Sequence, residues 1–588
     1  MLRTEVARLK METTDMLRLK QRVLVSTCAF IAGTSLFSQT APAQTYAKGD
    51  IFGGGASVPA PYARQTFDCY ALPTDLIIAG NPPSFEQIAP FDYTGSVPQN
   101  CATTHITTKS TIYYVSASAG VGILATFAHD PTLYGYINQG NNAYFPSIQF
   151  GMSTTSLVST DVGVYNNGGT ETQGKSSVTI AAPGAVSCTG GSKNPYPNPL
   201  QCYGPLVQFP YAITPIAFAY NSIYKKVLNS DGSETDYHLN LKYARGDGSG
   251  GLRLSPTTYC KIFNGQITNW NDPALTTDNG GQSLKDPNDP DTFSVTLQIV
   301  GRSDSSGATS ILSRHLANVC AGLSGNQYTT GSSTLPSSLQ GPTYNASNPN
   351  YPPVSGETPG KFTLAPNNSG VAQYVAFTAT PGGSNPSNCS DGAACIQLGR
   401  ITYSGTDYVL PYVAETQQNN YNLNSTTLQN SSGNWEDPSA STAQAAYSSI
   451  LPPQSTSKGK YCATCTNYGY RNDPTAWVQS TSPTALIANP GNSGAYPIVG
   501  TANWIAYQCY ASKNKTATLV GVMRYVDLKP INTDNKKGIL ASAGLSPMAK
   551  AWRTAIEETF VSNSDGLGLN IVKVGTAGTC SGAGIIGG

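Results

Sequence analysis

The turn from Gly301 to Thr309, with the sequence GRSDSSGAT, has the residue types that bind a small oxyanion. It lies directly before residues 310–316 (SILSRHL), whose spacing predicts a helix. A helix N-terminus offers unpaired backbone N–H groups, hydroxyls add donors, and an arginine can contact two oxygens at once. These residue types could hold an oxyanion, with Asp304 orienting the arginine. On this stretch alone an ordinary N-cap is favoured, with Ser305 or Ser306 capping the helix and Arg302 on the surface.

Two earlier stretches have a similar pattern of strand, small residues and helix. Residues 50–62 (DIFGGGASVPAPY) predict a short strand, a glycine turn and a helix that begins with proline, which favours the first helical turn. Residues 111–124 (TIYYVSASAGVGIL) predict a strand, small residues and an apolar helix. Each stretch alone is a weak signal. Together, the three turns favour α/β lobes whose loops converge on one small ligand.

The elements that join these turns also have recognisable patterns. Residues 208–221 are a long apolar stretch of strand character, suited to a crossing between lobes. Residues 259–275 predict a short helix, a glycine stop and an aromatic turn. Near the C-terminus, residues 545–560 predict an amphipathic helix with Ser546 as N-cap and Pro547 at its first position.

Two glycine motifs are rejected as nucleotide sites. Residues 169–176 (GTETQGKS) match the P-loop pattern, but residues 177–180 predict a strand where that motif requires a helix. Residues 246–251 fit a dinucleotide spacing without the surrounding strand–helix–strand unit. The sequence therefore indicates no cofactor.

Length and charge limit the possible partners. A chain of 588 residues is long for one core and favours two lobes. Charged residues make up only 11% and give a net charge of +1, so no basic field exists for nucleic acid or an anionic membrane. Recognition of an anion must therefore be local.

The first 43 residues predict a signal peptide with an upstream extension. Basic residues precede the apolar run 23–37, and Ala41-Pro42-Ala43 forms a small-x-small cleavage signal. We expect cleavage near Ala43 and a periplasmic or secreted mature chain. No later stretch is apolar for the roughly 18 residues of a membrane span.

Cysteine usage agrees with export. Of thirteen cysteines, Cys28 lies in the apolar run and twelve remain, an even number that favours disulfides of undetermined pairing. The CxxC of Cys462 and Cys465 could be a redox pair or half a zinc site, but with four histidines and no second such motif a structural bridge is favoured, and no metal is expected. The disulfide candidates are Cys69, Cys101, Cys188, Cys202, Cys260, Cys320, Cys389, Cys395, Cys462, Cys465, Cys509 and Cys580.

Several segments, in order along the chain, resemble the periplasmic phosphate-binding protein of phosphate ABC transporters (PstS-type) and its secreted relatives. The most specific are the turn ending in Trp270-Asn271-Asp272-Pro273 and the Arg302 motif. The matching segments are Gly53–Tyr62, Ser118–Gly120, Phe150–Thr154, Gln208–Pro210, Ile262–Leu275, Arg302–Gly307, Asn368–Val371 and Ala495–Ile498.

The resemblance implies an α/β, two-lobe periplasmic-binding-protein fold (Venus-flytrap, type II) with chain crossings near 211–221 and 496–507. The first lobe would comprise residues 44–216 and 500–588, and the second lobe residues 217–499. The chain exceeds the family's usual size through polar insertions, which we expect to be ordered surface loops: 163–203, 322–360, 382–394 and 415–460.

Carried over position by position, the resemblance implies an oxyanion site without catalytic residues. Two positions depart from the family. Members usually carry an aspartate where Thr154 stands, which accepts the proton of hydrogen phosphate and repels sulfate; threonine weakens that discrimination. Ala308 replaces a usual hydroxyl residue. The implied ligand residues are Ser57, Val58 through its backbone, Ser118, Thr154, Arg302, Ser306, Gly307 and Ala308, with Asp304 orienting Arg302.

Three functional hypotheses follow. The first is a non-catalytic binding protein for phosphate or a related tetrahedral oxyanion, serving uptake or scavenging, with a membrane ABC permease as a possible partner. The alternative is an extracellular structural or adhesive protein that assembles with copies of itself through the inserted loops and has a degenerate pocket. A hydrolase of phosphate esters is disfavoured, because the sequence has no GxSxG elbow, histidine-rich cluster or paired acids for two metals.

Overall fold

The computed structural model describes most of the chain after residue 45. The described residues are 46–72, 105–135, 144–189, 193–247, 250–343, 357–376, 387–388, 394–412, 420–455, 469–481, 485–528, 538–576, 578–582 and 584–588. The predicted signal peptide and upstream extension, residues 1–43, lie outside this set. Within it, no helix is both long and apolar enough to traverse a bilayer.

One mixed sheet forms the framework of the described part of the chain. Most of its strands are parallel to a neighbour, and two long strands cross its middle. In spatial order it contains β11 (Gln340–Thr343), β12 (Phe362–Ala365), β10 (Gln298–Arg302), β15 (Arg400–Gly405), β6 (Leu206–Tyr220), β19 (Val499–Tyr507), β3 (Phe150–Ser153), β1 (Ile51–Gly55) and β2 (Ile112–Ser116), while β16 (Asn424–Ser425) and β21 (Ser546–Pro547) also pair with β6.

The sheet consists of two parallel sets joined by antiparallel strands. In the first lobe, β1 is parallel to β2 and β3; in the second lobe, β10 is parallel to β12 and β15. β3 is antiparallel to β19, and β15 is antiparallel to β6. The predicted two-lobe α/β fold is therefore confirmed.

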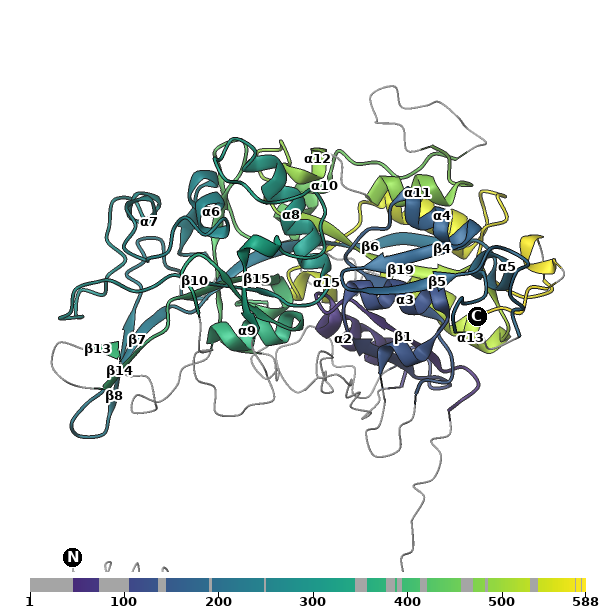
Figure 1. Ribbon diagram of the computed structural model, residues 1–588. Coiled ribbons are helices and arrows are strands. Elements are labelled where there is room, and N and C mark those ends of the chain that lie inside the picture. Colours follow the sequence, from purple (N-terminus) through teal and green to yellow (C-terminus); the bar gives the residue numbers. More distant parts are fainter. Residues whose placement is uncertain are drawn as a thin grey trace, which may run out of the picture. The chain divides into compact units, whose positions relative to one another are not determined.

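The two crossings are β6 and β19, which lie side by side (Figure 1). Residues 206–215 of β6 pair with β19, whereas residues 216–220 pair with β15 of the second lobe. Every residue of β6 is buried, which explains its near-continuous apolar sequence. The predicted crossings near 211–221 and 496–507 coincide with these strands.

The predicted strand–turn–helix units are confirmed. β1 leads into α2 (Ala60–Tyr70), β2 into α3 (Ala119–Ala128), and β10 into α8 (Gly307–Val319). A fourth unit, β12 followed by α9 (Asn367–Ala376), repeats the arrangement in the second lobe. Because each helix starts where a parallel strand ends, the helix N-termini point toward the carboxyl edge of the strands.

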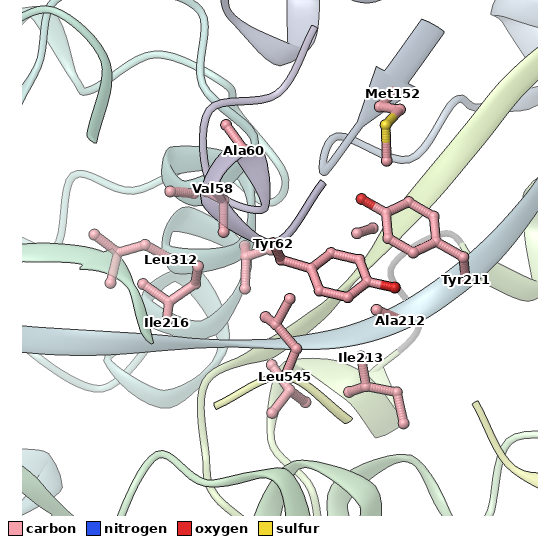
Figure 2. Packing of buried hydrophobic residues seen from close by; sticks show 14 of the residues in the cluster. Val58, Ala60, Tyr62, Met152, Tyr211, Ala212, Ile213, Ile216, Leu312 and Leu545 are labelled. Atoms are coloured by element: carbon pink, nitrogen blue, oxygen red, sulfur yellow. The ribbon is translucent and has the colours of Figure 1, made fainter. Parts of the chain in front are cut away.

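Apolar packing around β6 joins the two lobes (Figure 2). Ile213 and Ile216 of β6 belong to the same buried cluster as Tyr62 of α2 and Leu312 of α8. The rings of Tyr62 and Tyr211 stack with centroids 6.2 Å apart. The first-lobe and second-lobe helices of the site therefore share one core.

The predicted loop at 163–203 contains regular structure. Its described part includes the end of α4 (Ser159–Asn167), a hairpin of β4 (Gly169–Gln173) and β5 (Ser176–Ile180), and α5 (Pro199–Tyr203). The loop prediction was wrong there, because 169–173 and 176–180 pair as a hairpin whose alternating side chains Glu171, Val178 and Ile180 are buried. The P-loop match lies in this hairpin, so a strand follows it rather than a helix.

The predicted C-terminal helix starts later than expected. Ser546 and Pro547 form β21, which pairs with Ile213 and Ala212 of β6, and α16 (Lys550–Ile556) begins after Ala549 as N-cap. The capping prediction was wrong because pairing with β6 holds Ser546 in a strand, so tertiary contacts override the local preference.

The remaining strands and helices lie outside the main sheet. β7 (Ile223–Leu228), β8 (Glu234–His238), β13 (Ser387–Asn388) and β14 (Ala394–Gln397) form a four-stranded sheet; β9 (Arg253–Leu254), β17 (Thr427–Gln429) and β18 (Trp435–Glu436) form a three-stranded one; and β20 (Cys509–Tyr510) pairs with β22 (Val572–Lys573). The other α-helices are α6 (Pro256–Phe263), α7 (Pro273–Asp278), α10 (Ala440–Tyr447), α11 (Pro474–Thr481), α12 (Ala485–Ala488), α13 (Lys513–Leu528) and α15 (Ile539–Ser542). The short 3₁₀-helices are η1 (Pro131–Tyr134), η2 (Ser337–Leu339), η3 (Thr406–Tyr408) and η5 (Gly578–Ser581), and the π-helix η4 (Glu557–Val561) continues α16.

Seven of the predicted cysteines are disulfide-bonded. The pairs are Cys188–Cys202, Cys260–Cys320 and Cys509–Cys580, and Cys69 is also in a disulfide. The Cys509–Cys580 bond joins the C-terminal segment to β20. Cys101, Cys389, Cys462 and Cys465 lie outside the described residues, and Cys395 is described only as a backbone position of β14.

Candidate oxyanion-binding site

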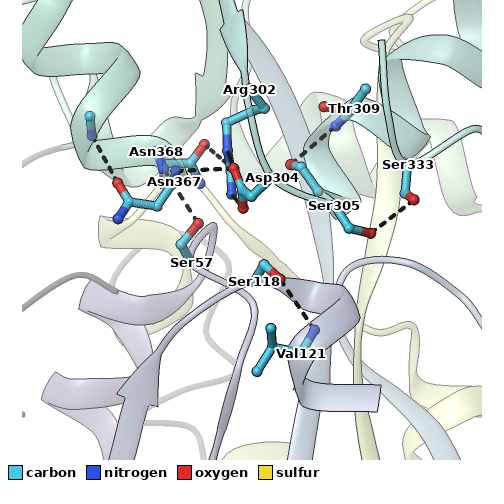
Figure 3. A network of polar contacts seen from close by, with 12 residues as sticks. Ser57, Ser118, Val121, Arg302, Asp304, Ser305, Thr309, Ser333, Asn367 and Asn368 are labelled. Carbon is cyan, nitrogen blue, oxygen red and sulfur yellow. Dashed lines mark hydrogen bonds and ion pairs between the residues drawn. The ribbon is translucent and has the colours of Figure 1, made fainter. Parts of the chain in front are cut away.

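Polar residues follow five parallel strands at their carboxyl ends. Ser57 follows β1, Ser118 follows β2, and Thr154 follows β3; Arg302 ends β10, and Asn368 follows β12. Ligands of α/β sheets bind at this edge, beyond the carboxyl ends of the strands. Figure 3 shows Ser57 and Ser118 of the first lobe facing Arg302 and Asn368 of the second.

Arg302 is buried and tied to Asp304. Only 3% of its surface is exposed, and Nε and Nη2 donate to the two carboxylate oxygens of Asp304 at 2.8 and 2.5 Å. Burial by itself lowers the pKa of Arg302, but the charge and hydrogen bonds of Asp304 more than offset it and hold this pKa above its ordinary value. The alternative that placed Arg302 on the surface is therefore wrong.

The guanidinium retains donors for a ligand. It has five N–H groups. Two bond to Asp304, and one on Nη1 donates to Oδ1 of Asn368 at 3.2 Å. One N–H on each terminal nitrogen therefore has no partner among the described residues, which is the arrangement that meets two oxygens of one anion.

The three predicted serines accept hydrogen bonds from backbone N–H groups (Figure 3). Ser118 caps α3 at 3.2 Å and Ser306 caps α8 at 3.4 Å, so the N-cap interpretation is correct for Ser306. Ser57 accepts from the N–H of Asn368 at 3.4 Å. Because each oxygen is already an acceptor, its own O–H remains to donate to an anion.

Thr154 and the first residues of α8 are packed tightly together. Thr154 is buried, and its Oγ1 has no hydrogen-bond partner in the described structure. A Cβ atom on Gly307 would overlap this Oγ1, so only glycine fits at the first position of α8. Ala308 is fully buried at the next position, and Val58 is buried beside Ser57. All the sequence-predicted ligand residues therefore lie at the strand ends or helix starts described above.

Asn368 is a site residue to which sequence reasoning gave no role. It is fully buried, its Oδ1 accepts from Arg302, and its N–H donates to Ser57. Its Nδ2 is a buried donor without a partner in the described structure. The segment 368–371 was recognised as part of the resemblance. Its place after an apolar strand, 362–365, is the signal that would have pointed to a ligand role.

Tyr403 connects the start of α8 to the end of β10 through its hydroxyl group. Its hydroxyl bonds to Oγ1 of Thr309 at 2.6 Å and accepts from the backbone N–H of Arg302 at 3.3 Å. Burial raises the pKa of Tyr403 to about 12, so the hydroxyl keeps its proton. The start of α8 and the end of β10 are thereby held together.

The site is rich in donors and poor in groups that could act as a base. The carboxylate of Asp304 is occupied by Arg302 and by the N–H of Asn367 at 3.1 Å. His315 bonds to Tyr259 and to the Ala488 carbonyl, away from the serine hydroxyls. In the described residues, no group of three His, Cys, Asp or Glu side chains is placed to hold a metal ion. The arrangement can hold an anion by hydrogen bonds.

This chain is similar to several known proteins. A family profile described as "PBP superfamily domain" matches residues 200–526. Alkaline phosphatase L of Pseudomonas aeruginosa PAO1 is 25% identical over 363 residues, covering 62% of this chain and 68% of that protein. A phosphate-binding protein from an unknown prokaryotic organism is 25% identical over 343 residues, covering 57% and 73%. The solved phosphate-binding protein from Stenotrophomonas maltophilia is 19% identical with a TM-score of 0.49, covering 91% and 98%.

The profile spans more than half of the chain, so the protein belongs to the PBP superfamily. The resemblance found in the sequence is confirmed at this level. The superfamily's two-lobe architecture matches the two parallel strand sets that β6 and β19 connect.

Proposed function

We propose that the protein binds inorganic phosphate, or a related tetrahedral oxyanion, between its two lobes without transforming it. The observation that carries this proposal is the buried guanidinium of Arg302, which has two N–H groups left for a ligand and faces serine hydroxyls of the other lobe. The charge of Arg302 is already paired with Asp304, but buried N–H groups without acceptors are costly, and an oxyanion would accept hydrogen bonds from the two that remain.

The relatives support phosphate as the ligand. One is named a phosphate-binding protein and another an alkaline phosphatase, and both names concern a phosphoryl group. We favour binding over hydrolysis, because the serine hydroxyls of the site contact backbone N–H groups rather than a histidine or carboxylate that would activate them.

Thr154 is proposed to relax the choice of anion. A carboxylate at this position would accept the proton of hydrogen phosphate and repel sulfate, whereas a threonine hydroxyl can also donate. Its Oγ1 is buried beside the N-terminus of α8 and has no hydrogen-bond partner in the described structure, so no other described residue uses its donor or its acceptors. We therefore expect sulfate to compete with phosphate.

We further propose that the protein works outside the cytoplasm in phosphate uptake or scavenging. The predicted signal peptide and the disulfides support export. The lobes would close on the anion by rotation about β6 and β19, and a membrane permease could receive the ligand.

Calorimetric titration with phosphate, sulfate and arsenate tests this function. We expect one phosphate per chain, competition by sulfate, and a higher melting temperature in the presence of phosphate. Absence of heat with every oxyanion, together with multimers in sedimentation, would instead favour the structural or self-assembling alternative.

A further inference from the structure

A cavity of about 450 Å³ opens beside Arg302 and Ser118. It lies between the two lobes, because residues of α3 and η1 line one wall and the turn after β10 lines the other. Ligand pockets for organic molecules have volumes of about 300–1,000 Å³, whereas a water molecule occupies about 30 Å³. The cavity therefore has room for much more than a four-oxygen anion.

The cavity is lined by polar and apolar side chains together. Ser118, Arg302 and Ser305 are among the polar ones. The apolar side chains that line it are Val121, Leu124, Leu133 and Leu335. Apolar walls add nothing to the binding of a bare phosphate ion, but they stabilise a ligand that carries an apolar group.

The hairpin of β4 and β5 forms a third side of the cavity. Its turn, Gln173 to Ser176, lines the space, and Gly174 has a φ of +64°. A Cβ atom added to Gly174 would lie 2.8 Å from the Cβ of Ser305. The hairpin therefore contacts the Arg302 turn of the second lobe directly and closes that side.

Charges around the cavity suit a doubly charged ligand. Lys175 of the hairpin and Arg302 are the cations of its lining, and Asp304 is the one acid among the described lining residues. Both oxygens of Asp304 accept hydrogen bonds from Arg302, so its charge is compensated.

We infer that the site also accepts a phosphate monoester with a small apolar organic group. Phosphoryl oxygens would accept from Arg302 and Ser118, which both line the cavity, and the ester oxygen would carry the organic group into the cavity along Leu133. This inference rests on the proposed oxyanion site and extends its ligand class.

The test compares phenyl phosphate with inorganic phosphate by calorimetry, using the full oxidised chain. Leu133→Trp fills the cavity from one wall, and Thr334→Trp fills it from the opposite wall in case the first variant is unstable. Ile106→Trp, at a side chain that is 66% exposed, is the matched control. We expect each cavity variant to lower the affinity for phenyl phosphate by about tenfold or more and to keep the affinity for phosphate within about twofold of the wild type. The control variant should change neither affinity.

The outcomes separate this inference from the proposed function. If phosphate binds to the wild-type protein and phenyl phosphate does not, the cavity inference is overturned and the phosphate site stands. Equal loss of both ligands in the two cavity variants, or loss of neither, would also overturn it. If neither ligand binds to the wild-type protein, the oxyanion site itself fails, and the inference fails with it.

Discussion

Gly307 and Thr154 touch across the two lobes. Gly307 is the first residue of α8 in the second lobe, and Thr154 follows β3 in the first. A Cβ atom at position 307 would overlap the Thr154 hydroxyl, which is buried. The approach of the lobes at the start of α8 therefore depends on the absence of a side chain at this position.

Gly307→Ala should separate the lobes at this contact. Alanine is a good helix former, so α8 itself should be preserved. We expect oxyanion affinity to fall by about tenfold or more, because a loss of about 1.4 kcal/mol in binding free energy already has that effect. Calorimetry on Gly163→Ala gives the matched control, since a Cβ there meets open space. Wild-type affinity in Gly307→Ala would contradict the closed geometry.

Thr154→Asp should restore discrimination against sulfate. The carboxylate would accept the proton of hydrogen phosphate and repel sulfate, which has no proton to donate. We expect sulfate affinity to fall by about tenfold or more while phosphate binding persists. Thr154→Asn has a similar shape without the charge and should retain sulfate. The proposed role of position 154 in anion selectivity is wrong if competition titrations give the same ratio of phosphate affinity to sulfate affinity for both variants.

Asn368→Asp tests the residue that sequence reasoning missed. The change keeps an acceptor for Arg302 but replaces the unpartnered buried donor with a negative charge. We expect oxyanion affinity to fall by about tenfold to a hundredfold. Asn288→Asp makes the same charge change at an exposed position and should bind normally. Equal oxyanion affinities for the two variants would show that Asn368 does not contribute to oxyanion binding.

Local patterns were sufficient to predict the strand–turn–helix units. The apolar run of β6 and the turns before α3 and α8 follow from short-range sequence, because strand burial and helix capping are local preferences. The pattern at Ser546 and Pro547 failed, since pairing with β6 depends on a residue more than three hundred positions away. Pairing with such a distant strand cannot be predicted from a short stretch of local sequence.

Residues of the candidate site could be picked out where a motif carried their chemistry. Arg302, Asp304 and Ser306 lie in one turn, and Arg302 lines the same cavity as Ser118 of the other lobe. Their role in binding an oxyanion stays a prediction. The role of Asn368 was not visible, because its contacts with Arg302 and Ser57 join three segments of the fold. The cavity along Leu133 was invisible for the same reason.

Stability should decrease in acid because of buried neutral histidine. Burial lowers the pKa of His315 from 6.5 to about 4. Between these values the unfolded chain binds a proton that the folded chain does not, so stability present above pH 6.5 is lost as the pH falls toward 4. The loss is about 3 kcal/mol for this group.

Thermal melting between pH 7 and pH 4 checks this dependence. His315→Gln should flatten the decline in melting temperature with falling pH, although it costs some stability at neutral pH. His238→Gln, at an exposed position, should keep the wild-type slope. If the melting temperature of His315→Gln falls with pH as steeply as that of the wild type, this histidine does not cause the loss of stability in acid.

Calorimetric titration of phosphate into the wild-type protein and Arg302→Ala tests the central claim most directly. Arg245→Ala removes a surface arginine, whose ion pair with Asp437 is partly exposed, and serves as the control. We predict one-to-one binding in the wild type and the control, and a loss of about a hundredfold or more in Arg302→Ala, since charge-assisted hydrogen bonds are worth about 1.5–3 kcal/mol each. Phosphate binding of equal strength in all three proteins would contradict the account.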